Sequence, residues 1–370
     1  MSKHIQDFHM EPHRPPSQRL GPLAFDAEPL NAFDAIIDVR SPAEFAEDHI
    51  YGAVNYPALN NEERVEVGTL YKHNPFEARK LGAAYIARNM SEYLQTSLKN
   101  HKKYWNPLVY CWRGGMRSSS VVHIMQEVGW PARQLQGGYK AYRQYILAQL
   151  ETLPQGLRFI VLCGPTGSGK SHLLHTLAKN EHQTLDLEAL AKHRGSLLGL
   201  LPGEAQPSQR FFETQLYEQL RHFSPHKPIF IESESKRIGQ LSLPPNLFQK
   251  MQESPCLQIE VPFDERVRFL CEDYICYINN PQLLRDKITR LAPYHSKAVL
   301  QNWFAFIDNE QYPQLVEELL KEHYDPLYWR STHKHHNQVD SSPKITLLSL
   351  DEAHLELAAK EFTRLSLESV

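Results

Sequence analysis

The stretch that decides the fold of the C-terminal half is RFIVLCGPTGSGKSHLLHTLAKN, residues 158–180. It opens with an apolar run, passes through a glycine-rich turn and closes with a segment of helical spacing. A buried strand that turns through glycines into a helix is the repeating unit of a parallel sheet covered by helices. A second apolar run, PIFIE at 228–232, is predicted to be another strand of that sheet. The C-terminal half is therefore predicted to be an α/β domain.

The turn GPTGSGKS matches the P-loop pattern Gly-x4-Gly-Lys-Ser without departure. In such a loop the backbone N–H groups surround a diphosphate, the lysine neutralises it, and the serine hydroxyl is available to Mg²⁺. The predicted diphosphate-binding residues are Gly164, Pro165, Thr166, Gly167, Ser168, Gly169, Lys170 and Ser171. The motif indicates phosphate binding and leaves the phosphate compound open.

The acidic partner of a P-loop is usually an Asp at the end of a neighbouring strand, whereas here that strand ends in Glu232. Glu232 or Glu234 is a candidate to position Mg²⁺ or to polarise a metal-bound water. The alternative is an acidic turn that caps a helix. The departure from Asp weakens a prediction of ordinary ATP hydrolysis. Cys163, beside the loop, is interpreted as a small strand residue.

The N-terminal half repeats the alternation of strands and helices. Strands are predicted at 34–40, 106–110 and 133–135, and helical spacing occurs at 81–98, at 118–128 and up to about 150. This order predicts a second parallel sheet with covering helices.

The predicted organisation is α/β in two domains, with Pro and Gly together at the junction. The predicted parts are an N-terminal extension at 1–29, a first domain at 30–150, a linker at 151–157, and a second domain at 158–370 with a helical region at about 263–328. Near the C-terminus we expect a polar, His-rich loop at 330–342, a last strand at 344–350, and a closing helix at 351–367 with Asp351 near its N-cap.

The first domain carries a reactive constellation, CWRGGMRS at 111–118. Glycines at a strand-to-helix turn allow N–H groups to point at the Cys111 thiol, and the helix N-terminus adds positive potential. These features are expected to lower the thiol pKa and to leave the sulfur facing solvent. The candidate catalytic residues are Cys111, Arg113 and Arg117, and the chalcogen-anion loop adds Trp112, Gly114, Gly115, Met116 and Ser118. The plain alternative is a buried structural cysteine before an ordinary turn.

The Cys-x5-Arg spacing from Cys111 to Arg117 leaves a second activity open. It is also the signature of cysteine phosphatases, because a wider ring of amides accommodates a tetrahedral phosphorus oxyanion. Tyr110 stands where those enzymes usually have His. A donor that contains both phosphorus and a chalcogen, such as selenophosphate, suits the wider loop equally well.

Composition excludes several classes of protein. The chain of 370 residues is 41% hydrophobic and 22% charged, which is typical of a folded protein. Five cysteines without paired short spacings argue against a disulfide framework, and a net charge of −3 does not indicate a nucleic-acid partner by itself. No apolar run reaches the roughly 18 residues that span a bilayer, and the N-terminus lacks a secretory h-region. We therefore expect a cytoplasmic protein without membrane contact, and a monomer.

Several motifs carry a resemblance to known families. IIDVRSPAEFAEDHIYGAVNYP at 36–57, CWRGGMRS and QGGYKAYR at 136–143 resemble the rhodanese domain over roughly 30–150. The resemblance then continues through GPTGSGKS, QPSQRFFE at 206–213, IESESKRIG at 231–239 and HYDPLY at 323–328. Over nearly its whole length the chain resembles the tRNA 2-selenouridine synthases, which join a rhodanese domain to a P-loop domain.

This resemblance implies an enzyme that converts 2-thiouridine at wobble position 34 of tRNA into 2-selenouridine. In the implied first step, geranyl diphosphate held by the P-loop alkylates the sulfur. In the second, selenium from selenophosphate replaces the geranylthio group through Cys111. The implied partners are tRNA with a 2-thiouridine wobble base, selenophosphate and the enzyme that supplies it. No tightly bound cofactor and no protein metal site is expected, and Mg²⁺ is left open.

An RNA substrate requires exposed basic groups. Candidate RNA contacts are Lys102, Lys103, Lys236 and Arg237, each of which is otherwise an ordinary solvated charge. Two other functions stay open. Tight ATP binding with turnover would indicate a sulfurtransferase coupled to a P-loop kinase or ATPase. Release of phosphate from an aryl phosphate would indicate a Cys-x5-Arg phosphatase.

Overall fold

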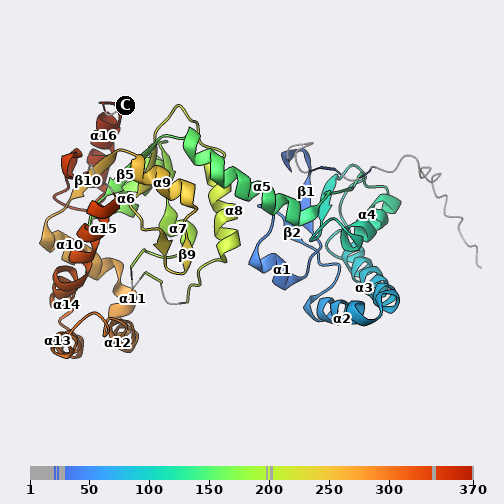
Figure 1. The fold of residues 1–370 in the computed structure, drawn as a ribbon, viewed down its shortest axis with the longest axis horizontal. Helices are drawn as coiled ribbons and strands as arrows, with labels where there is room; N and C mark the ends of the chain where they lie inside the picture. Colours follow the sequence, from blue (N-terminus) through green and yellow to red (C-terminus); the bar gives the residue numbers. More distant parts are fainter. Residues whose placement is uncertain are drawn as a thin grey trace, which may run out of the picture. The chain divides into compact units, whose positions relative to one another are not determined.

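The computed structural model describes residues 21, 23–24, 30–196, 199–200, 203–335 and 339–368. Contacts within the chain separate two compact units, Met1–Ala148 and Gln149–Val370. Each unit has its own parallel sheet with helices around it, as predicted (Figure 1). Most of the predicted extension at 1–29 lies outside the described residues, but Leu23 forms a parallel bridge with Leu135.

The boundary between the units lies inside a helix. Helix α5 (Gly138–Thr152) continues past the division, and a 3-10 helix follows at Leu153–Gly156. The segment 151–157, which the sequence indicates as a linker, is thus mostly helical, and Pro154 in it is buried. Proline fits the first turn of a helix, where its missing N–H has no partner to lose.

The sheet of the first unit has four parallel strands in the order β2-β1-β3-β4. The strands are β1 (Ala35–Asp38), β2 (Val54–Asn55), β3 (Pro107–Tyr110) and β4 (Arg133–Gln134). The helices before α5 are α1 (Pro42–Glu47), α2 (Asn61–His73), α3 (Pro75–Gln95) and α4 (Met116–Val128). The three predicted strands and the helices α3, α4 and α5 are confirmed. Helix α2 was not predicted, because its clearest sequence signal is the polar N-cap Asn60 rather than an apolar stripe.

The core of the first unit fixes both ends of the segment that carries Cys111. Every residue of β3 is buried. Helix α4 packs Val121 and Met125 into the same cluster as Val109 of β3, with all three side chains fully buried. Each such side chain contributes about 1.5–3 kcal/mol by leaving water. The loop between β3 and α4 is therefore held between two anchored elements.

The sheet of the second unit has five parallel strands in the order β11-β10-β5-β7-β6. The strands are β5 (Phe159–Cys163), β6 (Gln183–Leu185), β7 (Ile229–Glu232), β10 (Cys256–Glu260) and β11 (Lys344–Thr346), and a separate antiparallel pair is formed by β8 (Arg237–Ile238) and β9 (Leu241–Ser242). The strands that follow β5 lie on both sides of it, so its carboxyl end is a point where the strand order reverses. Ligands bind at such points in open α/β sheets.

Helices cover this sheet and continue into a mainly helical region. They are α6 (Lys170–Lys179), α7 (Leu187–Ala191), α8 (Gln209–Leu220), α9 (Pro245–Glu253), α10 (Phe263–Asp273), α11 (Ile275–Ile278), α12 (Pro281–Thr289), α13 (Lys297–Asp308), α14 (Tyr312–Leu319), a π-helix (Leu320–Tyr324), α15 (Asp325–His335) and α16 (Glu352–Glu368). α6 and α16 pack together in one apolar cluster with the sheet. α11 to α14 enclose a cluster of their own around the fully buried Trp303. The predicted helical region at 263–328 is confirmed.

The C-terminal expectations are confirmed except for the polar loop. The last strand is β11, and the Asp351 side chain accepts a hydrogen bond from the His354 N–H as an N-cap of α16 does. The predicted loop at 330–342 is wrong for its first part, because α15 runs to His335 and buries Thr332. The polar composition of this segment gave no sign that one side of the helix is packed against the rest of the unit. Among the described residues, no helix combines the length and the apolar character needed to cross a bilayer.

Candidate anion-binding loops

Cys111 lies at the base of a loop that wraps its sulfur. The residue follows β3, and α4 begins at Met116 with Gly115 as its N-cap. The Gly115 N–H donates to Sγ of Cys111 at 3.2 Å, and the Ser118 hydroxyl donates to the same atom at 3.1 Å. Two donors aimed at one sulfur are suited to stabilise an anion on it.

The expectation that the Cys111 sulfur faces solvent is wrong for this structure. Cys111 is only 3% exposed. The reason is local, since the donors that approach the sulfur also cover it. Of the other loop residues, Arg113, Gly115 and Met116 are exposed, Trp112, Gly114 and Arg117 are half-buried, and Ser118 is buried.

The two predicted cations of this loop have different surroundings. The Arg117 guanidinium donates to both oxygens of Glu44, at 2.7 and 3.3 Å. Burial disfavours the Glu44 carboxylate, but the hydrogen bond and charge of Arg117 outweigh it and hold the pKa of that carboxyl below its ordinary value. Arg117 is thus paired with Glu44, whereas the side chain of Arg113 is exposed to solvent.

The start of α5 closes the other side of the loop. The Tyr139 N–H donates to the Cys111 carbonyl at 2.9 Å, and the Lys140 N–H donates to the Trp112 carbonyl at 2.9 Å. Gly138 makes this approach possible: its φ is +56°, and a Cβ on it would meet the Cys111 carbonyl oxygen at 2.2 Å. The segment QGGYKAYR therefore supports the cysteine loop through the backbone.

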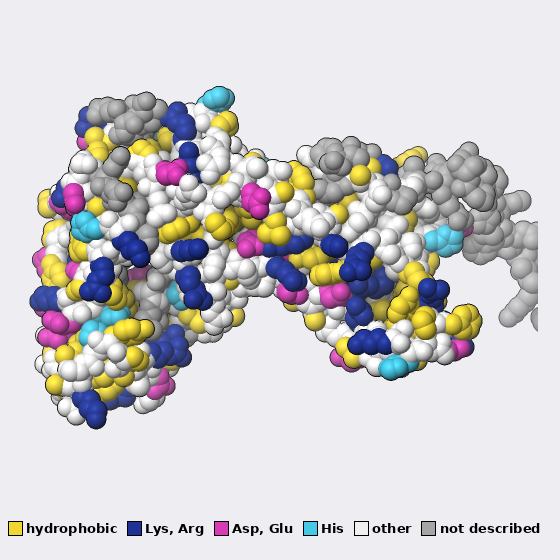
Figure 2. All heavy atoms as spheres, viewed as in Figure 1, with side chains coloured by type: hydrophobic (Ala, Val, Ile, Leu, Met, Phe, Trp, Pro, Cys, Tyr) yellow, Lys and Arg dark blue, Asp and Glu magenta, His cyan; other side chains and the backbone are white. Residues whose placement is uncertain are grey.

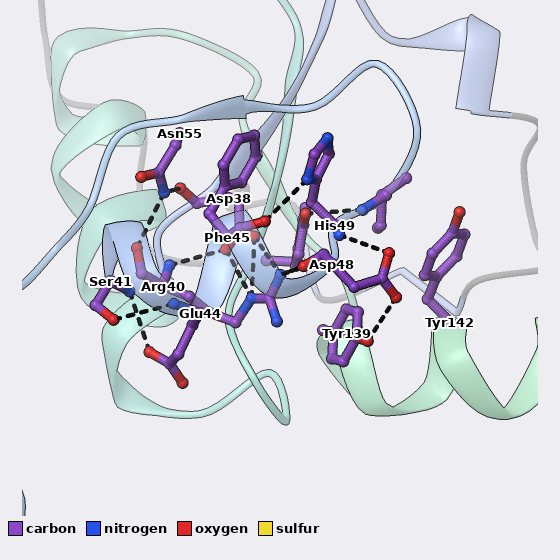
Figure 3. A network of polar contacts seen from close by, with 12 residues as sticks. Asp38, Arg40, Ser41, Glu44, Phe45, Asp48, His49, Asn55, Tyr139 and Tyr142 are labelled. Carbon is purple, nitrogen blue, oxygen red and sulfur yellow. Dashed lines mark hydrogen bonds and ion pairs between the residues drawn. The ribbon is translucent and has the colours of Figure 1, made fainter. Parts of the chain in front are cut away.

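A buried ion pair supports Tyr139 in turn (Figure 3). Arg40 and Asp38, both almost fully buried, form a salt bridge of 2.6 Å. The Arg40 guanidinium lies over the Tyr139 ring at 4.0 Å from its centroid, and the Tyr139 hydroxyl donates to Asp48 at 2.6 Å. Burial and the Asp48 hydrogen bond raise the pKa of Tyr139 well above its ordinary value, so the hydroxyl stays a donor. The residues of IIDVRSPAEFAEDHI thus position the cysteine loop without touching the sulfur.

The P-loop lies where the glycine pattern predicts, between β5 and α6. It borders a cavity of about 770 Å³. The Lys170 ammonium donates to the Gly164 carbonyl at 2.6 Å, inside its own loop. The Ser168 hydroxyl is buried and has no hydrogen-bond partner among the described residues. The ammonium also lies 5.7 Å from the centroid of the Tyr328 ring and interacts electrostatically with Glu188 and Glu234. A diphosphate can replace the loop carbonyl as its hydrogen-bond partner.

Three residues far along the chain hold the P-loop in shape. The Tyr328 hydroxyl accepts the Gly164 N–H at 2.6 Å. The Arg266 guanidinium donates to the Thr166 carbonyl at 2.8 and 2.9 Å. The same group makes a bidentate pair with Asp325, at 2.6 and 3.0 Å. None of Arg266, Asp325 and Tyr328 was predicted to belong to the site, although the motif HYDPLY contains the last two.

Glu232 is not the acidic group nearest to the P-loop serine. It ends β7 and is fully buried. One oxygen accepts the Glu188 N–H at 2.7 Å, and the other has no partner among the described residues. Burial and the charge of Glu188 raise the pKa of Glu232 well above its ordinary value. Glu232 therefore anchors the start of α7 rather than facing the loop.

Glu188 and Glu234 form the acidic pair beside the loop. The Ser171 hydroxyl donates to Glu188 at 3.0 Å. Burial and the charge of Glu188 raise the pKa of Glu234 to about 8, so the two carboxyl groups share a proton near neutral pH. Sequence reasoning missed Glu188 because it also missed the short strand β6 before it. Among the described residues, no three His, Cys, Asp or Glu are arranged to hold a metal ion by themselves.

Two family models match the chain, a rhodanese-like domain at 26–145 and a tRNA 2-selenouridine synthase AAA domain at 157–287. A tRNA 2-selenouridine synthase of Nitrosomonas europaea is 37% identical over 264 residues, covering 70% of this chain and 68% of that protein. Those of Bdellovibrio bacteriovorus and Hydrogenovibrio crunogenus are 32% and 33% identical, covering 81% and 83% of this chain and 89% and 91% of their own lengths. The chain belongs to the tRNA 2-selenouridine synthase family.

The remaining motif of this tRNA 2-selenouridine synthase family member, QPSQRFFE, has a structural role. The Gln206 side chain accepts the Gln240 N–H at 2.8 Å, and the Gln209 side chain accepts the Ser242 N–H at 2.8 Å. Both contacts hold the β8–β9 hairpin, which follows the segment that carries Glu234. The motif therefore supports the acidic side of the P-loop site.

The predicted RNA contacts of this family member lie at the surface. Lys102 and Lys103 are exposed in the first unit, and Lys236 and Arg237 are exposed in the second. Figure 2 shows Lys and Arg side chains spread over the visible face of each unit, with Asp and Glu between them. The four side chains are accessible, and their contact with RNA stays a prediction.

Proposed function

We propose that this protein is an enzyme that converts 2-thiouridine at wobble position 34 of tRNA into 2-selenouridine. The relatives described above are named tRNA 2-selenouridine synthases. The observation that carries the proposal is the presence of two anion-binding loops in one chain. One is built around the Cys111 sulfur and the other around Lys170.

The P-loop unit performs the first step, S-geranylation. The thione sulfur of the base attacks C1 of geranyl diphosphate, and the C1–O bond breaks with its electron pair going to the diphosphate. The base then loses its N3 proton. Lys170 and the loop amides stabilise the charge that develops on the departing diphosphate. Ser171 and Glu188 offer the oxygen ligands that suit an Mg²⁺ ion accompanying the diphosphate.

The first unit performs the second step, in which selenium replaces sulfur. The selenium of selenophosphate adds to carbon 2, geranylthiolate leaves, and water cleaves the phosphorus–selenium bond to give phosphate. Selenium keeps the oxidation level of selenide throughout, so no reductant is needed. Cys111 and its loop hold the anionic donor and deliver the selenium. The N–H of Gly115 and the hydroxyl of Ser118 fix the sulfur of Cys111, and the exposed Arg113 supplies the positive charge that attracts the anionic donor.

The Cys-x5-Arg phosphatase stays the alternative function of this loop. The Arg117 guanidinium makes two hydrogen bonds to Glu44 and has further N–H donors for an oxyanion. Release of phosphate from an aryl phosphate, lost in Arg117→Met, would support the phosphatase.

The test is Cys111→Ser in the full chain, supplied with a 2-thiouridine anticodon stem-loop, geranyl diphosphate and selenophosphate. Nucleoside mass spectrometry should find 2-selenouridine with the wild type and only S-geranyl-2-thiouridine with the variant. Cys276→Ser, in α11 of the other unit, is the control and should retain both steps. Formation of 2-selenouridine by Cys111→Ser at the wild-type rate would overturn the role of Cys111.

A further inference from the structure

A small apolar pocket opens beside the P-loop cavity, among the helices that follow β10. Its volume is about 60 Å³. Its far wall is formed by α11, α12 and α14, through Tyr277, Ile278, Leu284, Leu315, Val316 and Leu319. No charged side chain is among its described lining residues. The pocket lies in the helical region that no step described so far uses.

The pocket and the P-loop cavity share a mouth. Thr166, Leu270, Tyr274 and Tyr324 line both spaces. Leu270 lies directly on the loop, because a Cβ on Gly167 would meet its Cδ1 at 2.8 Å. Tyr324 ends the π-helix, whose wider turn is a feature common at functional sites. A molecule with an anionic head on the P-loop and an apolar tail therefore has a continuous path.

We propose that this pocket binds the distal isoprene unit of an allylic diphosphate whose diphosphate lies on the P-loop. The inference rests on the proposed function and adds the element that selects the length of the prenyl chain. The first isoprene unit lies at the shared mouth, between Tyr274 and Tyr324. Electron-rich ring faces there favour the positive charge that develops on C1 as the diphosphate departs.

The size of the pocket sets the length of chain that it accepts. A cavity of about 150 Å³ holds one benzene molecule, so about 60 Å³ cannot enclose ten carbon atoms. It suits the terminal branched end of the chain, with the rest in the mouth. With the first isoprene unit assigned to the mouth and the second to the pocket, a five-carbon chain leaves the pocket empty, and a fifteen-carbon chain carries one isoprene unit more than these two spaces are assigned. The pocket thus favours a ten-carbon donor.

The lining also argues against the base of a nucleotide. A buried purine needs hydrogen-bond partners for its ring nitrogens. The polar side-chain groups among the described lining residues are all hydroxyls, from Thr166, Ser196 and four tyrosines, and that of Tyr277 already donates to the Leu200 carbonyl. A hydrocarbon requires no such partners.

The experiment compares Val316→Phe with Val299→Phe in the full chain. Both valines are half-buried on neighbouring helices, but only Val316 lines the pocket. Prenyl transfer to a 2-thiouridine stem-loop is measured with dimethylallyl, geranyl and farnesyl diphosphate. Each buried methylene contributes about a fourfold gain in binding, so Val316→Phe should lower kcat/KM for geranyl transfer at least about tenfold. Dimethylallyl transfer should change by less than about threefold, and Val299→Phe should leave the ratio of the two donors unchanged.

A second variant enlarges the pocket instead of filling it, and it tests the inference if Val316→Phe does not fold. Leu284→Ala enlarges the pocket and should raise farnesyl transfer relative to geranyl transfer at least about fivefold. Equal effects of the pocket and control variants on the donor ratio would overturn the inference while leaving the proposed function intact. Absence of any prenyl transfer by the wild type would overturn both.

Discussion

The Cys111 loop and the P-loop are built alike, but only the P-loop is open. Each follows an interior strand of a parallel sheet and leads into the N-terminus of a helix. The sulfur of the first loop already accepts two hydrogen bonds, and its residue is 3% exposed. The second loop borders a cavity of about 770 Å³. The cations differ too, since Arg117 is paired with a carboxylate and Lys170 with loop carbonyls.

This difference corresponds to two uses of the donors. In the first loop the donors fix the sulfur of a side chain that belongs to the loop, so they can close over it. A loop that binds and releases a diffusing diphosphate needs an open space and a cation that can exchange partners. One backbone device, the turn from a strand into a helix N-terminus, serves both purposes.

The largest effect is expected from Lys170→Ala. Loss of the charge opposite the departing diphosphate should lower kcat/KM for geranylation by about 100- to 1000-fold, as loss of one transition-state donor does elsewhere. Selenium incorporation into a stem-loop that already carries S-geranyl-2-thiouridine should stay at the wild-type rate. Mass spectrometry of both reactions measures this separation of the loops.

Lys179→Ala is the matched control for that separation, because Lys179 is an exposed lysine of the last turn of the same helix. It should leave both reactions unchanged. If Lys170→Ala slowed selenium incorporation as much as geranylation, the two loops would not act as separate sites, and the comparison would fail.

The sequence predicted the paired strand–loop–helix units because each is local. Apolar runs and glycines mark β3, β5 and their loops within about 25 residues of chain. The same local signals predicted α4, α6 and the helical region after 263. The resemblance added the families of the two units and the implied reaction, which no local pattern contains.

The supports of the two loops could not be predicted in the same way, since they come from distant parts of the chain. Arg266 meets Thr166 across 100 residues, and Tyr328 meets Gly164 across 164. Glu188 was not predicted to belong to the site because the strand before it, β6, is only three residues long and gives little sequence signal. The burial of Cys111 was mispredicted for a related reason, since the groups that cover a side chain depend on how neighbouring backbone closes over it.

Arg266→Met should have the next largest effect, on stability. Arg266 is 6% exposed and Asp325 22%, so removing the guanidinium leaves a largely buried carboxylate and the Thr166 carbonyl unpaired. The cost should be about 3 kcal/mol. Arg117→Met removes the corresponding arginine of the cysteine loop, which is more exposed at 16%. Its partner Glu44 is as exposed as Asp325, but it keeps its contacts with Arg64 and with the Ser41 N–H. Its cost should be about 1 kcal/mol.

Hydrogen exchange of backbone amides in the full chain distinguishes these two losses. Arg266→Met should speed exchange in β5 and β7 and spare β1 and β3, whereas Arg117→Met should act only in the first unit. Arg266→Lys, which keeps the charge and loses the bidentate geometry, should fall between wild type and Met. Equal costs for Arg266→Met and Arg117→Met would contradict the view that the P-loop depends more on its distant support.

The smallest effect is a pH dependence of opposite sign in the two units. The pKa of Glu234 is raised to about 8 by burial and by Glu188, so the folded form keeps a proton that the unfolded chain releases near its ordinary value of 4.5. The stability from this group is full below that value and is lost as pH rises toward 8. Glu44 behaves oppositely: the pKa of its carboxyl is lowered, so its contribution is present above its ordinary value and is lost as pH falls below it.

Glu234→Gln isolates the contribution of the P-loop side, because an amide cannot ionise. Between pH 5 and 8 the calorimetric stability of the second unit should fall less in this variant than in the wild type, by an amount on the order of 1 kcal/mol. The fall should not vanish, since the pKa values of Glu188 and Glu232 are also raised by burial. In Glu44→Gln the first unit should lose less stability than in the wild type as the pH falls, and its stability at alkaline pH should depend on pH as in the wild type. A wild-type second unit whose stability rose between pH 5 and 8 would show that the acidic pair is ionised in the folded protein, and the P-loop cation would then already have carboxylate partners, as Arg117 does.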